Sequence, residues 1–262
     1  MLGQSLDTSE QDVACATVIG GGAFGTALGL VLARKRAKVK VWVRSEDQAT
    51  EVNTTKENKK YLPNVTLPDN MEWTSNISFA VEGSELVLLA IPTQFLRSFL
   101  EANRSTLPVG VPLVVCAKGI EIGTLQTPFQ ITHDELPGKY AKYMAVISGP
   151  SFAKEIAENQ PTMLTCAAED PVVSNLVQRK LSCKQANFKV YTSPDIIGCE
   201  IAGAVKNVLA IASGASAGCG FGNNARAALI CRGLTEMTRL AQRCLPPSST
   251  PSSPPSPYVT PS

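Results

Sequence analysis

Three glycines near the N-terminus constrain the fold more than any other feature. Gly20, Gly22 and Gly25 form a Gly-x-Gly-x-x-Gly pattern between the short apolar run "ATVIG" and the Ala- and Leu-rich run 23–36. In that setting the first glycine allows a tight turn, the second lets the backbone approach a pyrophosphate, and the third lets helix and strand pack closely. The N–H groups at the start of the helix attract an anion. The pattern predicts dinucleotide binding, with a purely structural glycine turn as the alternative.

The first part of the chain alternates between strand-like and helix-like runs. Short β-branched or apolar runs occur at 38–43, 85–91, 112–117 and 143–148, and helical runs at 23–36 and 93–103. A further strand–helix–strand set follows at 162–168, 171–181 and 188–193. Such alternation is typical of an α/β fold with a doubly wound parallel sheet. We therefore predict a Rossmann-type dinucleotide-binding domain over residues 15–193.

The sequence changes after Ser193 from alternating strand-like and helix-like runs to helical runs alone. A run with little β-branching continues to about Gly218, and a second helical run, 224–243, follows a Gly-rich break. We interpret residues 194–244 as the start of an all-α substrate domain that two helices alone cannot complete. Residues 245–262 are mostly Pro, Ser and Thr and are predicted to be disordered, as are the polar residues 1–14.

Composition limits the classes of partner. The 262 residues carry a net charge of only +2, which gives no global field favouring nucleic acid or an anionic membrane. No apolar run is expected to be long and charge-free enough to span a bilayer. The eight cysteines are scattered without a C-x-x-C pair, so we expect no metal site and a reducing compartment. The single histidine, His133, is expected to be solvated.

These features favour a cytoplasmic location. The N-terminus "MLGQSLDTSEQD" is short and acidic, unlike a signal or transit peptide. A plastid location stays open for a chain with a longer N-terminus. The sequence also leaves a homodimer open.

A lysine in an apolar run is the strongest candidate for acid–base chemistry. Lys206 and Asn207 lie in "GAVKNVLA", and Glu200 is the other charged residue between 196 and 220. A lysine that snorkels to the surface is the ordinary alternative. On a helix, however, Lys206 shares a face with small residues that leave room for a ligand. If it is desolvated near a second cation such as Lys118, its pKa falls and it can exchange protons near neutral pH.

Other polar residues follow predicted strands, where ligands of doubly wound sheets bind. Lys118 comes after strand 112–117, and could equally be a solvated loop residue. Ser148 and Gly149 end strand 143–148, and Ser151 begins a helix whose N–H groups suit an anion. The substrate is therefore expected to be anionic.

Arg44 lies at the end of the second strand, where the residue that selects between NAD and NADP is found. An arginine there can accept a 2′-phosphate, stack on adenine or remain a solvated charge. Glu46 and Asp47 follow closely and oppose a phosphate. NAD is the expected cofactor, with NADP as the alternative.

Several ordered motifs resemble one family. The segments are "GGGAFGTALG", "KKYLPNVTLPDN", "AIPTQFL", "AKGIE", "SGPSFAKEI", "GAVKNVLAIASG" and "GFGNNARAALICRGLTEM", which span Val18 to about Ala241. The chain resembles the NAD(P)-dependent glycerol-3-phosphate dehydrogenases, which reduce dihydroxyacetone phosphate. The resemblance implies a Rossmann-type domain followed by a helical domain that supplies the substrate pocket.

The resemblance also implies roles for individual residues. Lys206 becomes the catalytic proton donor and acceptor, and Lys118 a contact to both substrate and cofactor. Asn207, Ser148 and Ser151 are implied near the substrate. The implied cofactor contacts are Gly20, Gly21, Gly22, Ala23, Phe24, Gly25, Arg44, Phe95, Lys118 and Ala153.

The chain departs from the family pattern after "RGLTEMTRLA". Family members continue with a Gly-Asp motif and a Ser-Arg-Asn motif whose arginine grips the substrate phosphate, and nothing here matches either. We therefore expect a truncated helical domain and keep a weak or inactive dinucleotide-binding isoform as an alternative. Another lysine-dependent dehydrogenase of the same architecture is disfavoured by "SGPSFAKEI" and "GFGNNARAAL".

Overall fold

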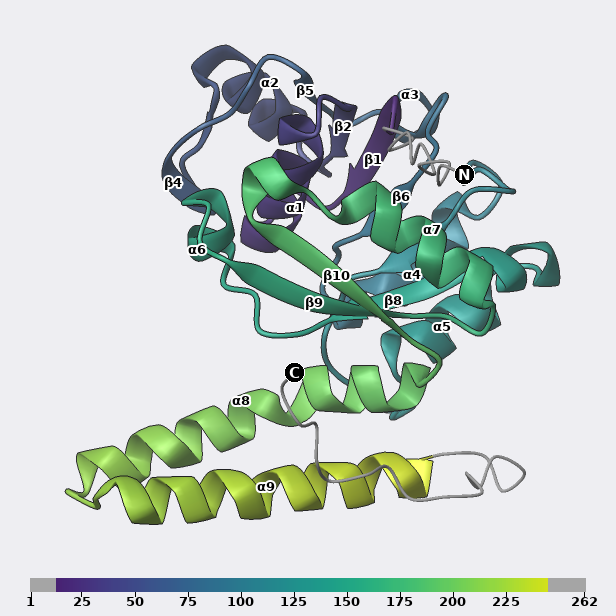
Figure 1. Ribbon diagram of the computed structural model, residues 1–262. Coiled ribbons are helices and arrows are strands. Elements are labelled where there is room, and N and C mark those ends of the chain that lie inside the picture. The colour runs from purple at the N-terminus through teal and green to yellow at the C-terminus, as the bar shows by residue number, and fades with distance from the viewer. Residues whose placement is uncertain (1–12, 245–262) are drawn as a thin grey trace, which may run out of the picture. The chain divides into compact units, whose positions relative to one another are not determined.

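A computed structural model describes residues 13–244, which fall into two compact units (Figure 1). The first unit extends to Ala204 and the second begins at Val205. The predictions of disorder for residues 1–12 and 245–262 lie outside the described residues. Val13 is buried in the core of the first unit.

The first unit is built on an eight-stranded sheet with the order β10-β9-β8-β7-β6-β1-β2-β5. The strands are β1 (Cys15–Ile19), β2 (Lys38–Trp42), β5 (Met71–Thr74), β6 (Val87–Leu89), β7 (Leu113–Val115), β8 (Met144–Ser148), β9 (Thr162–Ala167) and β10 (Phe188–Ser193). In register, Val18 of β1 pairs with Val41 of β2 and with Leu88 of β6. The predicted doubly wound α/β architecture is confirmed.

One strand pairing corrects the prediction of a parallel sheet. β8 and β9 pair antiparallel, whereas every other neighbouring pair in the described sheet is parallel. The helix between them, α6 (Ala153–Ala157), has only five residues. At about 1.5 Å per residue it is too short to carry the chain back along the sheet. The chain therefore enters β9 in the opposite direction.

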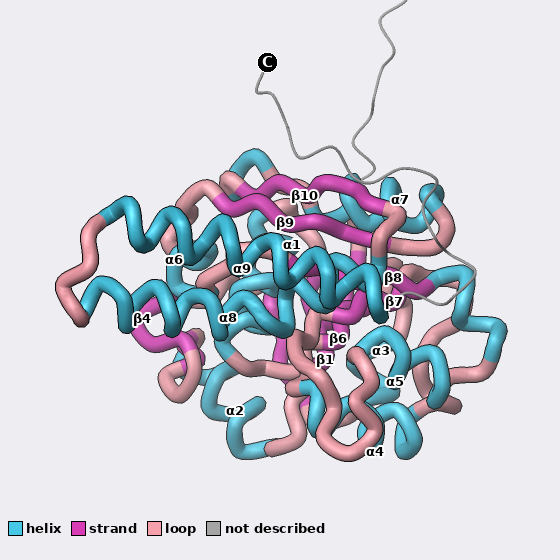
Figure 2. Tube along the Cα trace, turned by 90° about the horizontal axis from the view of Figure 1, so that it is seen from below, coloured by secondary structure: helices cyan, strands magenta, loops and turns pink. Residues whose placement is uncertain are grey.

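Helices cover both faces of the sheet (Figure 2). They are α1 (Ala23–Arg34), α2 (Glu46–Thr55), α3 (Ile77–Val81), α4 (Thr93–Asn103), α5 (Pro128–Glu135), α6 and α7 (Pro171–Leu181), with 3₁₀ turns at Gly138–Tyr143 and Lys184–Ala186. Successive strand residues enter two separate apolar cores: Val18 packs with Leu28 of α1, and Ile19 packs with Leu96 of α4. Burial on both faces explains why these strands are apolar runs without alternation.

A small antiparallel hairpin, which the alternation did not predict, lies between α2 and β5. Its strands are β3 (Glu57–Asn58) and β4 (Leu62–Thr66). Asn58 of this hairpin is buried. The hairpin lies beside the glycine turn, because the Asn58 amide donates a hydrogen bond to the Gly21 carbonyl oxygen.

The predicted helices of the C-terminal part are confirmed as α8 (Ile196–Gly218) and α9 (Asn223–Cys244). α8 begins in the first unit and continues into the second, which also contains α9. Gly233 of α9 is buried, and a Cβ atom there would lie 2.2 Å from a methyl group of Leu209, so the two helices pack closely.

Among the described helices, α8 is long and apolar enough to cross a membrane by length and composition. The expectation that no run meets this criterion is therefore wrong. The run passes because Glu200 and Lys206 are its only charged residues. The finding is weak evidence of a membrane span, because core helices of soluble proteins pass the same test.

Candidate active site

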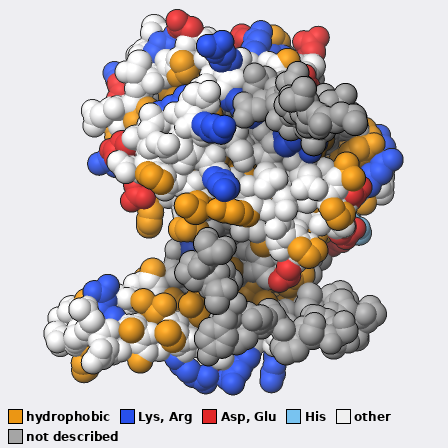
Figure 3. Space-filling model, in the orientation of Figure 1, with side chains coloured by type: hydrophobic (Ala, Val, Ile, Leu, Met, Phe, Trp, Pro, Cys, Tyr) orange, Lys and Arg blue, Asp and Glu red, His pale blue; other side chains and the backbone are white. Residues whose placement is uncertain are grey.

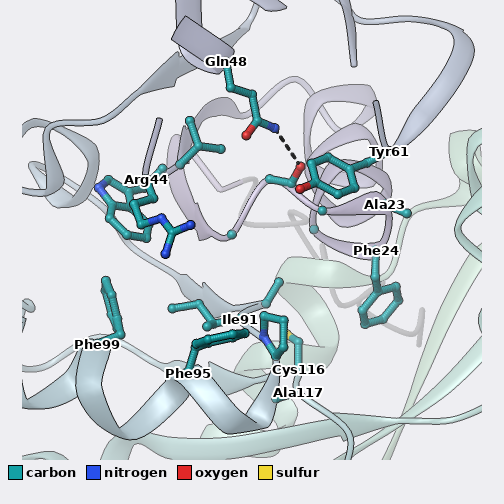
Figure 4. A pocket seen from close by; sticks show the side chains of 18 of the residues that line it. Ala23, Phe24, Arg44, Gln48, Tyr61, Ile91, Phe95, Phe99, Cys116 and Ala117 are labelled. Atoms are coloured by element: carbon teal, nitrogen blue, oxygen red, sulfur yellow. Dashed lines mark hydrogen bonds between the residues drawn. The ribbon is translucent and has the colours of Figure 1, made fainter. Parts of the chain in front are cut away.

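A cavity of about 840 Å³ opens at the carboxyl ends of the central strands (Figure 4). Its wall consists of the chain segments that leave β1, β2, β6 and β7, together with part of α4. The lining residues are Gly20, Gly21, Gly22, Ala23, Phe24, Gly25, Trp42, Val43, Arg44, Ser45, Gln48, Lys60, Tyr61, Ala90, Ile91, Pro92, Phe95, Ser98, Phe99, Asn103, Cys116, Ala117, Lys118 and Ser151. The volume and position suit a ligand of dinucleotide size at the switch point of a doubly wound sheet.

The glycine turn has the tight geometry that the motif predicts. Gly20 has φ +114°, and a Cβ atom on it would lie 2.5 Å from the carbonyl oxygen of Ala90. A Cβ atom on Gly25 would lie 1.9 Å from the carbonyl oxygen of Gly20. Gly22, in contrast, has nothing within 4 Å of its Cβ position, although it lines the cavity. The turn is thus closed on the protein side and open toward the cavity.

The first N–H groups of α1 carry no side-chain cap. Gly22 is the N-cap residue, and no side chain bonds to the helix start. The first turn also lacks an acidic residue. Unpaired N–H groups and the helix dipole together favour an anion at this end of α1.

The charges along the cavity are all positive. Arg44, Lys60 and Lys118 line it, and the described lining contains no carboxylate. Glu46 faces away, because its carboxylate accepts a hydrogen bond from the Ser75 hydroxyl. Neither Glu46 nor Asp47 lines the cavity, although both follow Arg44 in the sequence. The cavity therefore suits a ligand with phosphate groups.

The structure brings Lys118 together with Phe24 and Ser151. The Lys118 ammonium nitrogen lies 2.9 Å from the Ser151 hydroxyl oxygen and 3.4 Å from the Gly149 carbonyl oxygen. It also lies 4.7 Å from the centre of the Phe24 ring. These contacts hold the cation at the cavity wall.

The loop that carries Lys118 is fixed by the first turns of α4. The Thr93 hydroxyl donates to the Lys118 carbonyl oxygen at 3.1 Å. The Arg97 guanidinium donates to both carboxylate oxygens of Glu121 and also pairs with Glu135. The Arg97 hydrogen bond lowers the pKa of Glu121 below its usual range. A network with this many charge-assisted bonds restricts the loop.

Four of the predicted site residues lie outside the described cavity wall. Ser148 is buried at the end of β8, and Ala153 packs against the core at the start of α6. Lys206 is half-buried on α8 and Asn207 is exposed, and both belong to the second unit. The other predicted site residues all line the cavity: they are the residues of the glycine turn, Arg44, Phe95, Lys118 and Ser151.

Several residues that line the cavity were not predicted from the motifs. Lys60 and Tyr61 come from the β3–β4 hairpin, and Gln48 from α2. The segment "KKYLPN" resembles the family, but the resemblance implies no role for any of its side chains. Among residues 13–244, no group of three or more His, Cys, Asp and Glu side chains is placed to hold a metal ion.

Comparison with known proteins identifies the family. The model of the NAD-dependent glycerol-3-phosphate dehydrogenase N-terminus matches residues 15–174, and the model of the C-terminus of the same family matches residues 195–253. The chain belongs to the NAD-dependent glycerol-3-phosphate dehydrogenase family. The predicted resemblance is confirmed.

Relatives of this dehydrogenase family match over most of the chain. A glycerol-3-phosphate dehydrogenase [NAD(P)+] of Anaeromyxobacter dehalogenans is 44% identical over 228 residues, which cover 87% of this chain and 68% of the relative. A glycosomal NAD(+) enzyme of Trypanosoma brucei brucei is 46% identical, over 85% of this chain and 64% of its own length. The chain thus spans about two thirds of the length of these relatives.

Solved structures of dehydrogenases from the family share the fold. The glycerol-3-phosphate dehydrogenase of Coxiella burnetii superposes with a TM-score of 0.76 at 36% identity, covering 87% of this chain and 68% of its own. The enzyme of Saccharomyces cerevisiae gives a TM-score of 0.76 at 29% identity, with 87% and 70% covered. The fold assigned from the sequence is therefore the fold of the family.

Proposed function

We propose that the chain is a glycerol-3-phosphate dehydrogenase that transfers a hydride between NAD(H) and sn-glycerol 3-phosphate or dihydroxyacetone phosphate. The observation that carries the proposal is the cavity at the glycine turn, which is lined by three cations and by no described carboxylate. Both the cofactor and the substrate carry phosphate groups. The substrate is a small phosphorylated molecule, in agreement with the family.

The residues of the cavity fit a nicotinamide dinucleotide. The uncapped N–H groups of α1 would bind the pyrophosphate, and the open space over Gly22 lets it approach the backbone. Phe24 and Phe95 line the same cavity, where they would pack against the cofactor. When bound, the nicotinamide ring supplies or accepts the hydride. NAD is the proposed cofactor, and NADP is the alternative that Arg44 allows.

The proposed proton carrier is Lys206. Its ammonium group would give a proton to the oxygen on C2 as dihydroxyacetone phosphate is reduced, and would take the proton back in the reverse direction. Lys118, Asn207, Ser148 and Ser151 are proposed substrate contacts, and Ala153 a cofactor contact. The helical segment 194–244 would supply Lys206 and Asn207, and residues 15–193 the remainder.

The proposal is tested with purified full chain, free of any other dehydrogenase. We expect oxidation of NADH that depends on dihydroxyacetone phosphate, and reduction of NAD that depends on sn-glycerol 3-phosphate. Other phosphorylated ketones serve as control substrates. If the chain binds NADH but neither dihydroxyacetone phosphate nor any control substrate raises NADH oxidation above the background rate, the proposed reaction is wrong for this chain.

A cytoplasmic location is part of the proposal. It is supported by the eight free cysteines, which are scattered along the chain without a C-x-x-C pair. Imaging of a fluorescently tagged full chain checks this location. A signal confined to an organelle or a membrane would contradict it.

A further inference from the structure

The two carbonyl groups of the glycine turn are both held from the protein side. The Gly21 carbonyl oxygen accepts a hydrogen bond from the Asn58 amide at 3.0 Å and one from the Gln48 amide at 3.3 Å (Figure 4 shows the latter). The Gly22 carbonyl oxygen accepts from the Thr26 hydroxyl at 2.8 Å. Asn58 also donates to that hydroxyl oxygen at 2.8 Å. One asparagine is therefore connected to both carbonyl groups.

These hydrogen bonds also fix the direction of the N–H groups on the opposite side of the turn, because the peptide bonds are planar and trans. No described peptide bond is cis. In a trans peptide the carbonyl of one residue and the N–H of the next point in opposite directions. With the carbonyls of Gly21 and Gly22 directed toward Asn58 and Thr26, the N–H groups of Gly22 and Ala23 point away from those side chains. Gly22 and Ala23 are the residues that line the cavity there.

Asn58 is buried, and its side chain acts there as a hydrogen-bond donor. Thr26 is fully buried. The Asn58 oxygen Oδ1 is buried without a described hydrogen-bond partner. An unpaired buried acceptor destabilises the fold, and an apolar side chain of the same shape would avoid this cost. The Gly21 carbonyl oxygen can only accept a hydrogen bond, so the Asn58 amide nitrogen must face it. The two hydrogen bonds that Asn58 donates, to Gly21 and to Thr26, explain why a polar side chain is buried here.

We propose that Asn58 is a positioning residue for cofactor binding: through Gly21 and Thr26 it directs the N–H groups of Gly22 and Ala23 toward the pyrophosphate. It acts through the backbone of the turn and does not itself touch the cofactor. Because Asn58 ends β3, directly before the turn of the β3–β4 hairpin, the same contact fixes Lys60 and Tyr61 at the cavity wall. This inference rests on the proposed function.

The test compares variants at the two ends of α1. Asn58→Asp removes the donor without changing the shape of the side chain. Thr26→Val removes the hydroxyl that holds Gly22 and adds no charge, and Thr26→Ser restores that hydroxyl. The matched control is Asn70→Asp, because the Asn70 amide likewise donates to two carbonyl oxygens, those of Ala33 and Ala37, at the far end of α1. NADH and ADP-ribose are the probes, and each dissociation constant is measured together with thermal unfolding.

We expect Asn58→Asp and Thr26→Val to weaken NADH and ADP-ribose by the same factor, about tenfold, since both probes carry the pyrophosphate. Thr26→Ser recovers most of the affinity. Asn70→Asp lowers the unfolding temperature without changing either dissociation constant. Equal affinities of wild type and Thr26→Val would overturn the proposal, and so would a loss for NADH alone.

A further variant separates this inference from the proposed function. Gly22→Val places a branched side chain in the open space where the pyrophosphate must approach. If Gly22→Val binds NADH as tightly as wild type, the cavity is not the cofactor site and the proposed function itself fails. If Gly22→Val loses binding while Asn58→Asp and Thr26→Val keep it, the cofactor site stands and only the positioning role is wrong.

Discussion

At the scale of single residues, Lys206 carries the most demanding prediction. It is the proposed proton donor and acceptor, and it lies half-buried among small residues of α8. Replacing it with methionine keeps the length of the side chain and removes the exchangeable proton. We expect Lys206→Met to lower kcat by roughly 10²- to 10⁴-fold in the reduction of dihydroxyacetone phosphate.

The control for this variant is Lys184→Met, which removes an exposed lysine from the 3₁₀ turn Lys184–Ala186. It should leave kcat within a few-fold of wild type. NADH affinity should survive in both variants, because Lys206 does not line the cavity at the glycine turn. A Lys206→Met enzyme that retains kcat within a few-fold would remove Lys206 from the mechanism.

Arg44 carries a prediction about cofactor choice. It lines the cavity, while the carboxylate of Glu46 is engaged by Ser75 and does not oppose it there. We expect the affinities for NADH and NADPH to differ by less than about a hundredfold, or about 2.7 kcal/mol. Arg44→Ala should weaken NADPH about tenfold more than NADH, because only NADPH carries the 2′-phosphate. Calorimetric titration of both cofactors against both proteins measures the difference.

At the scale of elements, Glu200 ties the first turns of α8 to the start of α5. The backbone N–H of Phe129 donates to the Glu200 carboxylate at 2.7 Å. Burial raises the pKa of Glu200 to about 7, although hydrogen bonds from Thr127 and Phe129 oppose the rise. The folded state therefore favours the protonated acid, whereas the unfolded chain ionises near its ordinary pKa of about 4.3.

The sign of the pH dependence follows from this difference. Between about pH 4.3 and pH 7 the folded state binds more protons at Glu200 than the unfolded state does, so its contribution to stability falls as the pH rises. Glu200→Gln is permanently neutral and keeps an oxygen that can accept from Phe129. We expect it to raise the free energy of unfolding at pH 8 by on the order of 3 kcal/mol, a gain that fades toward pH 4.

Urea unfolding across this pH range measures the effect. Glu155→Gln, at an exposed glutamate of α6, is the matched control and should show no comparable dependence on pH. A stability difference between Glu200→Gln and wild type that stays constant from pH 4 to pH 8 would mean that Glu200 is not the group that titrates.

At the scale of the whole molecule, the second unit leaves apolar side chains exposed. Val208 and Ile211 of α8 are 65% and 73% exposed, and Ile230 and Leu234 of α9 are 41% and 53% exposed. In Figure 3 hydrophobic side chains gather on these helices. Leu229 and Met237 of α9 are half-buried.

Exposed aliphatic groups of this kind bind hydrophobic dyes and promote association. We expect the full chain to bind anilinonaphthalene sulfonate at neutral pH with its secondary structure intact. Leu234→Ser should lower both the dye signal and any concentration-dependent increase in size during gel filtration. Leu164→Ser, in contrast, should unfold the first unit, because Leu164 is buried in its core. Dye binding that Leu234→Ser does not change would locate the apolar surface elsewhere.

Local sequence determined most of the first unit. The glycine spacing requires a turn at Gly20 whatever surrounds it, because only glycine tolerates its φ of +114° so close to Ala90. Apolar runs that recur between helical runs require a sheet covered on both faces. The same motifs identified the turn, Arg44, Phe95, Lys118 and Ser151, all of which line the cavity.

Tertiary structure decided the rest, because the deciding contacts join residues far apart in the chain. The antiparallel pairing of β8 with β9 depends on how far a short helix can carry the chain, which no strand pattern records. The role of Asn58 depends on a bond to Gly21, 37 residues away, and a polar residue in a two-residue strand gives no local sign of it. The raised pKa of Glu200 depends on burial beside α5, since an isolated helix would leave the carboxylate in water.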